Sequence, residues 1–378
     1  MLGRDTHLQL RSTDIGSFPL RNVDPVQYAQ GASDLEDGND TKAAEYFTHC
    51  HTSMFQRKLV ALGPNLSVPC YVQSSYDRDM VTQFLDPIVR KGQGLAKQGD
   101  KYLWNGSPIK LSTQHARIAE MVALERTAKS LCEELDLDYI QYRACVTGPF
   151  ELTLRLWRGM GISSHYEEAF IEAFTLIVKG YMQNAGISMK YLKPEILTLD
   201  EPSMGVTGVG DFFTDSPSDP YLSHLISCWN SIYSAIPKGC YRGLHLHASP
   251  FRELAKANWT LLEAHSDVIV NRDWLINHDR YLRAAIMRTD GPTIPPNADL
   301  KTVWADIQSG NYYPYLQSSA NMHTYLKAAI DRYTVNRIPF AGPECGLGSW
   351  DWPYGDVMVL ESFKRVQDVI NEFNQESD

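Results

Sequence analysis

Short apolar segments rich in β-branched and aromatic residues recur along the chain, and longer stretches with helical periodicity separate most of them. The strand-like segments are residues 13–19, 68–74, 139–150, 195–202, 241–249, 267–273, 282–291 and 337–346. Apolar residues recur every three or four positions in 79–92, 115–135, 166–186, 221–236, 251–265 and 357–373, as in amphipathic helices. Strands that alternate with helices in this way predict an α/β fold, a single parallel (β/α)8 TIM barrel.

One segment departs from this alternation. In residues 101–111, Asn105-Gly106 stands between arms of alternating apolar residues, which is the strongest short signal for a hairpin. We therefore predict a β-hairpin insertion in the barrel. The chain has 378 residues, which suits a barrel of about 250 residues with insertions, so we expect one domain over residues 1–378.

Composition narrows the classes of partner. The formal net charge of −10 argues against a general nucleic-acid binder, although a local arginine can still bind an anionic small molecule. No apolar stretch approaches the roughly 20 residues that span a bilayer, and the first residues are too polar for a secretory signal. We therefore expect a cytoplasmic protein with no membrane partner. The seven cysteines include no CxxC pair, which disfavours a disulfide scaffold.

Polar residues gather where the predicted strands end, and in TIM barrels the chemistry lies at the carboxyl ends of the strands. Burial of such groups is costly unless they meet each other or a ligand. The residues in question are Ser17, Asp200, Glu201, His245, His247, Arg272, Asp273, Asp290, Glu344 and Cys345. We expect them to line one site.

The segment RGLHLHASP (242–250) carries His245 and His247 at alternate positions, which point to the same face of a strand. Two such imidazoles can bind a metal, hold a substrate or fill a polar gap in a core. Together with Cys345, which lies in a glycine-rich turn, they form a plausible Zn²⁺ set with an open position for a thiol or water. By contrast, we interpret the segment THCHTSM (48–54) as polar residues at the start of a helix rather than as a metal site.

Three other candidates each have a structural alternative. The carboxylates of Asp200 and Glu201 can receive an ammonium group or cap a helix. The Gly16-Ser17 turn offers backbone N–H groups and a hydroxyl to a carboxylate, but such turns are common. Asp290 lies in RTDGP, where a turn alone accounts for an aspartate.

These motifs, taken in order, resemble the successive signatures of the cobalamin-independent methionine synthase family. The residues that carry the resemblance are Ile15-Gly16-Ser17-Phe18-Pro19, Asp200-Glu201-Pro202, His245 and Gly342-Pro343-Glu344-Cys345-Gly346-Leu347. The resemblance covers nearly the whole chain and corresponds to the catalytic C-terminal barrel of the family. It implies zinc-activated transfer of a methyl or other alkyl group to a thiol, with homocysteine giving methionine.

The resemblance also implies roles for individual residues. Ile15 and Ser17 correspond to the group that binds the substrate carboxylate, and Asp200 to the group that binds its ammonium. His245, His247 and Cys345 correspond to metal ligands. The methyl donor implied is a folate or a methylcorrinoid.

Several positions depart from the family pattern. His247 stands where the family has cysteine, and the family's glutamate ligand falls at Arg272, or at Asp273 if the register slips by one. Asp290 stands at the position of a histidine that protonates the leaving donor, so we assign it the catalytic position. Arg272 suits an anionic group on the substrate. A His-His-Cys set, with or without Asp273 or Asp290 as a further ligand, is less sulfur-rich than the family site and can accept iron as well as zinc.

Three functions follow in order of preference. The first is metal-dependent alkyl transfer to a thiol, giving methionine from homocysteine. The second is a diverged barrel enzyme, either a lyase or an iron-dependent, oxygen-using enzyme, that acts on a small anionic substrate near Arg272. The third is a barrel without catalytic activity that binds a corrinoid-carrying partner or a pterin.

Overall fold

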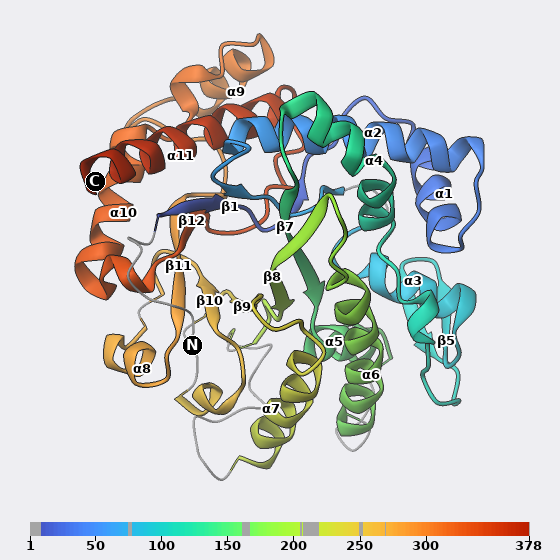
Figure 1. The fold of residues 1–378 in the computed structure, drawn as a ribbon. Helices are drawn as coiled ribbons and strands as arrows, with labels where there is room; N and C mark the ends of the chain where they lie inside the picture. Colours follow the sequence, from blue (N-terminus) through green and yellow to red (C-terminus); the bar gives the residue numbers. More distant parts are fainter. Residues whose placement is uncertain are drawn as a thin grey trace.

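The architecture is that of a computed structural model, and it describes residues 9–74, 78–160, 167–204, 206, 219–248, 252–268 and 270–377. Eight parallel strands form one sheet in the order β3-β1-β12-β11-β10-β9-β8-β7 (Figure 1). Their bounds are β1 Arg11–Thr13, β3 Ser67–Val68, β7 Ile140–Thr147, β8 Leu192–Asp200, β9 Tyr241–Leu246, β10 Leu261–Ala264, β11 Tyr281–Met287 and β12 Phe340–Pro343.

The two edges of this sheet approach each other just beyond β3. Cys70 forms an isolated parallel bridge with Arg143 of β7, and the Arg143 N–H donates to the Pro69 carbonyl oxygen at 2.9 Å. The sheet is therefore a nearly closed barrel, which confirms the predicted TIM-barrel fold.

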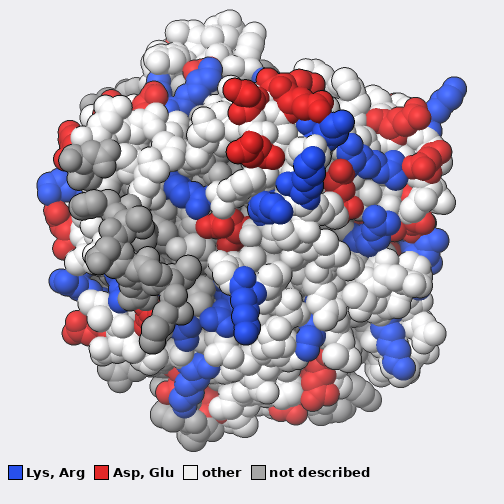
Figure 2. All heavy atoms as spheres, in the orientation of Figure 1, with Lys and Arg blue, Asp and Glu red and all other residues white. Residues whose placement is uncertain are grey.

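Helices surround the barrel (Figure 1). Their bounds are α1 Pro25–Glu36, α2 Lys42–Leu62, α3 Thr82–Lys91, α4 Ala119–Leu135, α5 Pro149–Met160, α6 Glu167–Ala185, α7 Pro220–Tyr233, α8 Arg272–Asn277, α9 Leu300–Gln308, α10 Ser319–Tyr333 and α11 Gly355–Ser377. None of the helices in the described ranges has the length and apolar character needed to cross a membrane. On the face seen in Figure 2, lysines and arginines are interspersed with acidic side chains.

Two of these helices begin with the same Asp-Pro pair. The Asp24 side chain accepts hydrogen bonds from the N–H groups of Val26 and Gln27, and Asp219 accepts one from Leu222. A proline follows each aspartate at the first helical position, where its missing N–H costs nothing. The sequence thus fixes where the two helices start.

The interior of the barrel changes from apolar to polar along its axis. Val68, Ile196, Leu261 and Phe340 form a buried apolar cluster, in which Leu261 and Phe340 are the first residues of their strands. They come from alternate strands of the barrel order, as expected for one layer of a TIM-barrel core. Toward the carboxyl ends of the strands, the buried interior contains the charged residues Arg143, Glu263 and Arg283. The polar residues at the strand ends follow.

The predicted hairpin insertion is present, but its turn lies earlier than Asn105-Gly106. β5 (Leu95–Gln98) pairs antiparallel with β6 (Lys101–Trp104) around Gly99 and the residue after it. Gly99 has φ of 57°, a conformation that glycine adopts without steric cost. Asn105-Gly106 follows the end of the hairpin, because Trp104 already pairs with Leu95.

Two elements predicted around residue 260 are wrong. The helix expected over 251–265 is a short 3₁₀ helix, Arg252–Lys256, followed by β10, and the strand expected over 267–273 is absent from its described residues. β10 is buried and pairs with β9 and β11 on its two sides. The Asn271 side chain accepts a hydrogen bond from the Trp274 N–H at 3.1 Å, which starts helix α8 where the apolar run predicted a strand.

Candidate metal centre

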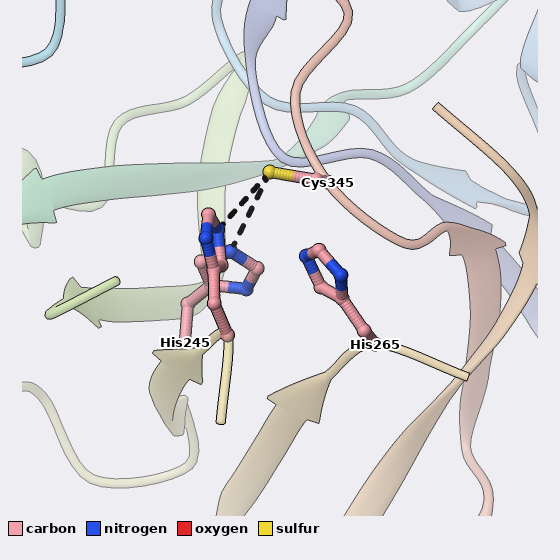
Figure 3. Close-up of side chains that lie close together, drawn as sticks. His245, His265 and Cys345 are labelled. Carbon is pink, nitrogen blue, oxygen red and sulfur yellow. Dashed lines mark hydrogen bonds between the residues drawn. The ribbon is translucent and has the colours of Figure 1, made fainter. Parts of the chain in front are cut away.

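Three histidines and a cysteine lie together at the carboxyl ends of the barrel strands. One ligand atom from each of His245, His247, His265 and Cys345 lies within 4.8 Å of all the others. The Cys345 Sγ atom is 3.3 Å from Nε2 of His247 and 3.9 Å from Nε2 of His245. Figure 3 shows the labelled side chains converging from separate strands.

The barrel topology brings these four residues together. His245 belongs to β9, and His247 follows the end of that strand. Cys345 comes two residues after β12, and His265 follows β10 directly. Parallel strands end on the same side of a barrel, so residues distant in sequence meet there. The three residues predicted as metal ligands, His245, His247 and Cys345, are thus placed side by side.

Sequence reasoning missed His265. In the sequence this residue fell at the end of a predicted helix, and Asp273 or Asp290 was the expected further ligand. The signal was the alternation in LLEAH (261–265), which places Glu263 and His265 on one face of a strand.

Burial sets the protonation of the cluster. His245 is 1% exposed, and burial, reinforced by His247 and Arg283, lowers its pKa well below the usual value. Burial and then His265 lower the pKa of His247 to about 4. Burial and then Asp200 raise the pKa of Cys345 to about 12. Near neutral pH the imidazoles of His245 and His247 therefore have free lone pairs, and the Cys345 thiol must release a proton to bind a cation.

The donor set fits a zinc-type cation. Cysteine sulfur and histidine nitrogen are the preferred Zn²⁺ ligands, and in a tetrahedral site their donor atoms lie about 3.4 Å apart. The four donor atoms here all lie within 4.8 Å of one another, which is close to this spacing. Nε2 of His265 is buried and has no hydrogen-bond partner, as expected for an imidazole nitrogen that binds a metal ion.

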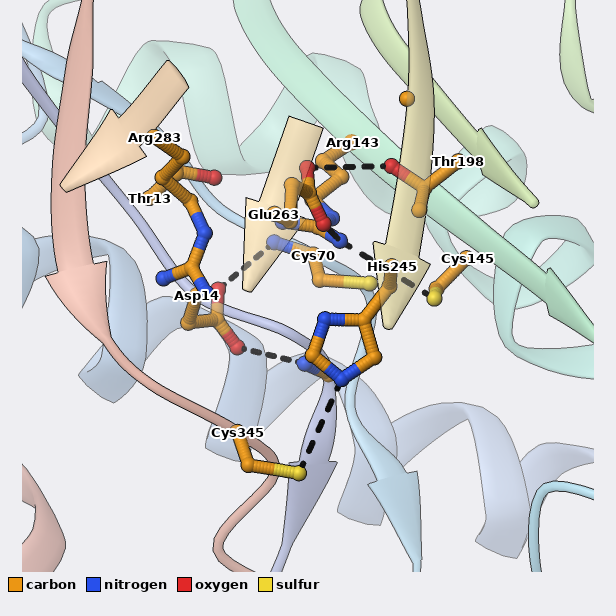
Figure 4. Close-up of polar contacts among 12 residues, drawn as sticks. Thr13, Asp14, Cys70, Arg143, Cys145, Thr198, His245, Glu263, Arg283 and Cys345 are labelled. Atoms are coloured by element: carbon orange, nitrogen blue, oxygen red, sulfur yellow. Dashed lines mark hydrogen bonds and ion pairs between the residues drawn. The ribbon is translucent and has the colours of Figure 1, made fainter. Parts of the chain in front are cut away.

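Charged residues lie in the barrel interior next to His245 (Figure 4). Arg143 forms a fully buried ion pair with Glu263, which also accepts a hydrogen bond from the Thr198 hydroxyl at 3.3 Å. Arg283 donates to the Pro343 carbonyl oxygen and, at 3.1 Å, to that of Glu344. These contacts anchor the turn that carries Cys345.

The Ile15-Gly16-Ser17 turn packs against the same segment. Ile15 is buried, and Gly16 has φ of 117°, where a side chain would be strained. The Asp14 carboxylate accepts the Gly16 N–H at 3.1 Å, and the Ser17 hydroxyl oxygen accepts the N–H of Gly348 at 3.2 Å. Ser17 therefore lies beside the turn that carries Cys345.

The adjacent carboxylates of Asp200 and Glu201 have different surroundings. Glu201 accepts hydrogen bonds from the N–H groups of Phe150 (3.2 Å) and Glu151 (2.7 Å) and from Nε1 of Trp229 (3.0 Å). It thus caps helix α5. Asp200 is 7% exposed, its Oδ1 has no hydrogen-bond partner, and burial and then Glu151 raise its pKa to about 7. Asp200 is the one of the two with an oxygen free for a ligand.

The remaining predicted residues lie outside this cluster. The expected position of Arg272 at a strand end is wrong, because Arg272 is the exposed first residue of helix α8, and Asp273 is exposed beside it. Asp290 is exposed in the loop after β11 and pairs with Arg288. The catalytic role of Asp290 and the anion-binding role of Arg272 stay predictions.

The fold and the cluster together define a TIM barrel with a candidate metal centre at its catalytic end. No protein-family model matches the chain, and no curated protein matches it. A B12-independent methionine synthase from Shewanella sp. W3-18-1, solved in complex with selenomethionine, has the same fold with a TM-score of 0.58, at 12% identity over 98% of this chain and 99% of that one. A crystal structure from Listeria monocytogenes, described as a putative vitamin-B12-independent methionine synthase, gives a TM-score of 0.54, also at 12% identity, over 97% of this chain and 99% of that one.

Likeness at 12% identity shows the fold. It confirms the TIM-barrel fold that the sequence predicted, because the chain shares this fold with both structures.

Proposed function

We propose that this protein is a metal-dependent transferase that moves a methyl or other alkyl group onto a thiol, with homocysteine as the acceptor and methionine as the product. The observation that carries the proposal is the convergence of three imidazoles and one thiol within 4.8 Å of one another at the carboxyl ends of the strands. The barrel shared with two methionine synthase structures supports it at the level of the fold.

His245, His247 and Cys345 are the residues that would hold the ion, and zinc is the ion that their chemistry suits best. A bound Zn²⁺ lowers the pKa of a coordinated thiol, so that the substrate is present as a nucleophilic thiolate near neutral pH. The low pKa of His247, about 4, keeps its imidazole free of a competing proton. The barrel wall excludes water from His245, which is 1% exposed.

The amino-acid end of the substrate is proposed to be held by two polar groups at the carboxyl ends of the strands. Ile15 and Ser17 bind the carboxylate through the backbone and the hydroxyl of their turn, and Asp200 binds the ammonium. The unpartnered Oδ1 of Asp200 supports this role, because a buried carboxylate oxygen is stabilised by a cation. The Shewanella protein was solved with an amino acid, selenomethionine, which agrees with a substrate of this class.

A second function stays in view because the cluster is rich in nitrogen. A site of three imidazoles and one thiol is also suited to iron. Iron in the purified protein, together with oxygen consumption, favours a diverged oxygen-using enzyme that acts on a small anionic substrate. Zinc favours alkyl transfer.

The test combines metal analysis with an alkyl-transfer assay. The purified protein is analysed for bound metals and then incubated with homocysteine and either a methylated folate or a methylcorrinoid, with methionine measured by mass spectrometry. We expect stoichiometric zinc, methionine formation, and loss of both in His245→Ala. The matched control is His278→Ala, which removes an exposed histidine of the loop after α8. Activity that persists in His245→Ala, in a protein without stoichiometric metal, contradicts the proposal.

A further inference from the structure

His265 lies just beyond the last paired residue of β10, so its backbone is not held by the sheet. The pairing of β10 with β9 ends at Ala264, and its pairing with β11 ends at Glu263. The His265 carbonyl oxygen then accepts the N–H of Val268 at 3.1 Å, which closes a tight turn. The position of the His265 imidazole therefore depends on whatever fixes this turn, and its buried Nε2 has no hydrogen-bond partner.

A carboxylate two residues earlier on the same face is already engaged. Glu263 is fully buried, forms an ion pair with Arg143, and accepts a hydrogen bond from the Thr198 hydroxyl at 3.3 Å. If this carboxylate moved away to bind a cation, the buried charge of Arg143 would be left uncompensated, which is strongly destabilising. Glu263 is thus unavailable as a ligand, and His265 is the donor that β10 offers.

The Glu344 side chain connects the turn that follows His265 to the strand end that carries Cys345. Glu344 is 8% exposed and its backbone N–H donates to the Met287 carbonyl oxygen at 2.8 Å. Its Oε2 accepts the hydroxyl of Ser266, at 3.3 Å, and its Oε1 accepts the N–H of Thr289, at 3.2 Å. One buried carboxylate therefore links the loops after β10 and β11 to the residue that precedes Cys345.

We propose that His265 is a fourth ligand of the metal centre and that Glu344 is the positioning residue that holds it within reach of Cys345. The inference rests on the proposed function, because it requires a cation at His245, His247 and Cys345. The ligand is a divalent cation of the zinc type, bound by three neutral imidazoles and one thiolate. The set has a single negative donor, so the centre keeps a net positive charge that attracts an anionic thiolate.

The experiment measures metal affinity and coordination in the full-length protein. Co²⁺ is titrated into each variant, and Zn²⁺ affinity is measured by competition with a chromophoric chelator. The sulfur-to-cobalt charge-transfer band reports whether Cys345 is a ligand, and the intensity of the visible ligand-field bands reports the coordination number. We expect His265→Ala to weaken Zn²⁺ binding at least 10-fold and to change the ligand-field bands while the sulfur band persists. His265→Glu retains affinity, because carboxylates also bind zinc.

The role of Glu344 is tested with three further variants. Glu344→Ala removes both side-chain contacts and is expected to weaken Zn²⁺ binding about 10–100-fold, as is common when an outer partner of a metal ligand is lost. Glu344→Gln preserves affinity, since an amide can accept from Thr289 and donate to Ser266. Ser266→Ala removes only the contact to the exposed serine, so it tests the link even if Glu344→Ala fails to fold. It is expected to weaken binding by a smaller factor.

A double variant separates positioning from general destabilisation. His265→Ala combined with Glu344→Ala is expected to bind no more weakly than His265→Ala alone, because Glu344 acts through His265. Additive losses overturn the role of Glu344. Wild-type affinity and an unchanged cobalt spectrum in His265→Ala overturn the inference and leave the proposed function with its other three ligands. A wild-type protein that binds neither cation overturns both.

Discussion

The chain contains two segments in which histidines stand two residues apart, and they have opposite surroundings. His245 and His247 are at the end of β9, with ring centroids 5.1 Å apart and Cys345 within 4 Å of both. His49 and His51 lie in helix α2, where His49 is exposed and His51 is buried. Alternate residues share a face on a strand, whereas on a helix they are turned roughly 200° from each other.

His51 has the surroundings of a core residue. Its ring stacks on Phe47, with centroids 5.9 Å apart, and on Phe55, at 6.2 Å. Its Nε2 accepts the N–H of Val72 at 3.2 Å. The comparison teaches that the same residue spacing favours a shared ligand only where the backbone period is two. Four variants test this contrast.

The largest expected effect is loss of metal from the strand segment. His245→Ala is expected to weaken Zn²⁺ binding by more than about 100-fold, beyond the loss usual for an outer partner, because it removes a ligand. In the absence of metal, its free energy of unfolding is expected to change by less than the free energy of Zn²⁺ binding does, which at 100-fold is about 2.8 kcal/mol. Competition titrations and metal analysis measure the effect, and wild-type affinity in this variant removes the contrast between the two segments.

The helix segment is expected to show the reverse pattern. His51→Ala leaves a cavity between two phenylalanines and leaves the buried N–H of Val72 without an acceptor, at a cost of about 2–4 kcal/mol in unfolding free energy. Metal affinity stays at the wild-type value. Denaturant unfolding and a zinc titration of the same preparation give both quantities, and a stable variant with weakened metal binding contradicts the core role.

The pH dependence of stability sharpens the role of His51. Burial and then Lys58 lower the pKa of His51 to about 3, whereas an unfolded histidine titrates near 6.5. Between these values the unfolded state binds a proton that the folded state excludes, so stability is full above pH 6.5 and falls as the pH drops toward 3. His51→Gln keeps an acceptor for Val72 and is expected to reduce the slope of unfolding free energy between pH 6 and 4 by about one proton, or ~1.4 kcal/mol per pH unit. An unchanged slope would show that His51 titrates normally in the folded protein.

The smallest effect is expected at the exposed member of the helix pair. His49→Ala removes a solvent-facing side chain, so its unfolding free energy should stay within about 0.5 kcal/mol of wild type and its zinc affinity should be unchanged. Any loss of metal in this variant points to a site on helix α2. The same two measurements decide the question.

The sequence predicted much of the barrel because its signals are local and regular. Seven of the eight predicted strand segments overlap barrel strands, and residues distant in the chain, such as His245 and Cys345, were placed together by the topology alone. The failure between residues 251 and 273 has a local cause. β10 has only four residues, Leu261–Ala264, so its alternation is a weak signal, and the apolar run after it is the more strand-like of the two.

The error in strand position carried into the site. Once the strand was expected over 267–273, its end fell at Arg272, and His265 was assigned to a helix. The sequence also could not show that Glu201 caps helix α5 while Asp200 keeps an unpartnered oxygen. This difference depends on where helix α5 begins relative to the end of β8. Contacts between elements decide such details, and a single sequence does not record them.

The position of β12 has a consequence for how the protein is made. This strand pairs with β1 on one side and β11 on the other, and it leads into the turn that carries Cys345, which lies 98 residues after His247 in the chain. During synthesis, the histidines leave the ribosome long before the cysteine that completes their site. The four donor atoms can come together only after β12, the last strand of the barrel, has joined the sheet, so we expect the proposed metal ion to be bound only late in folding.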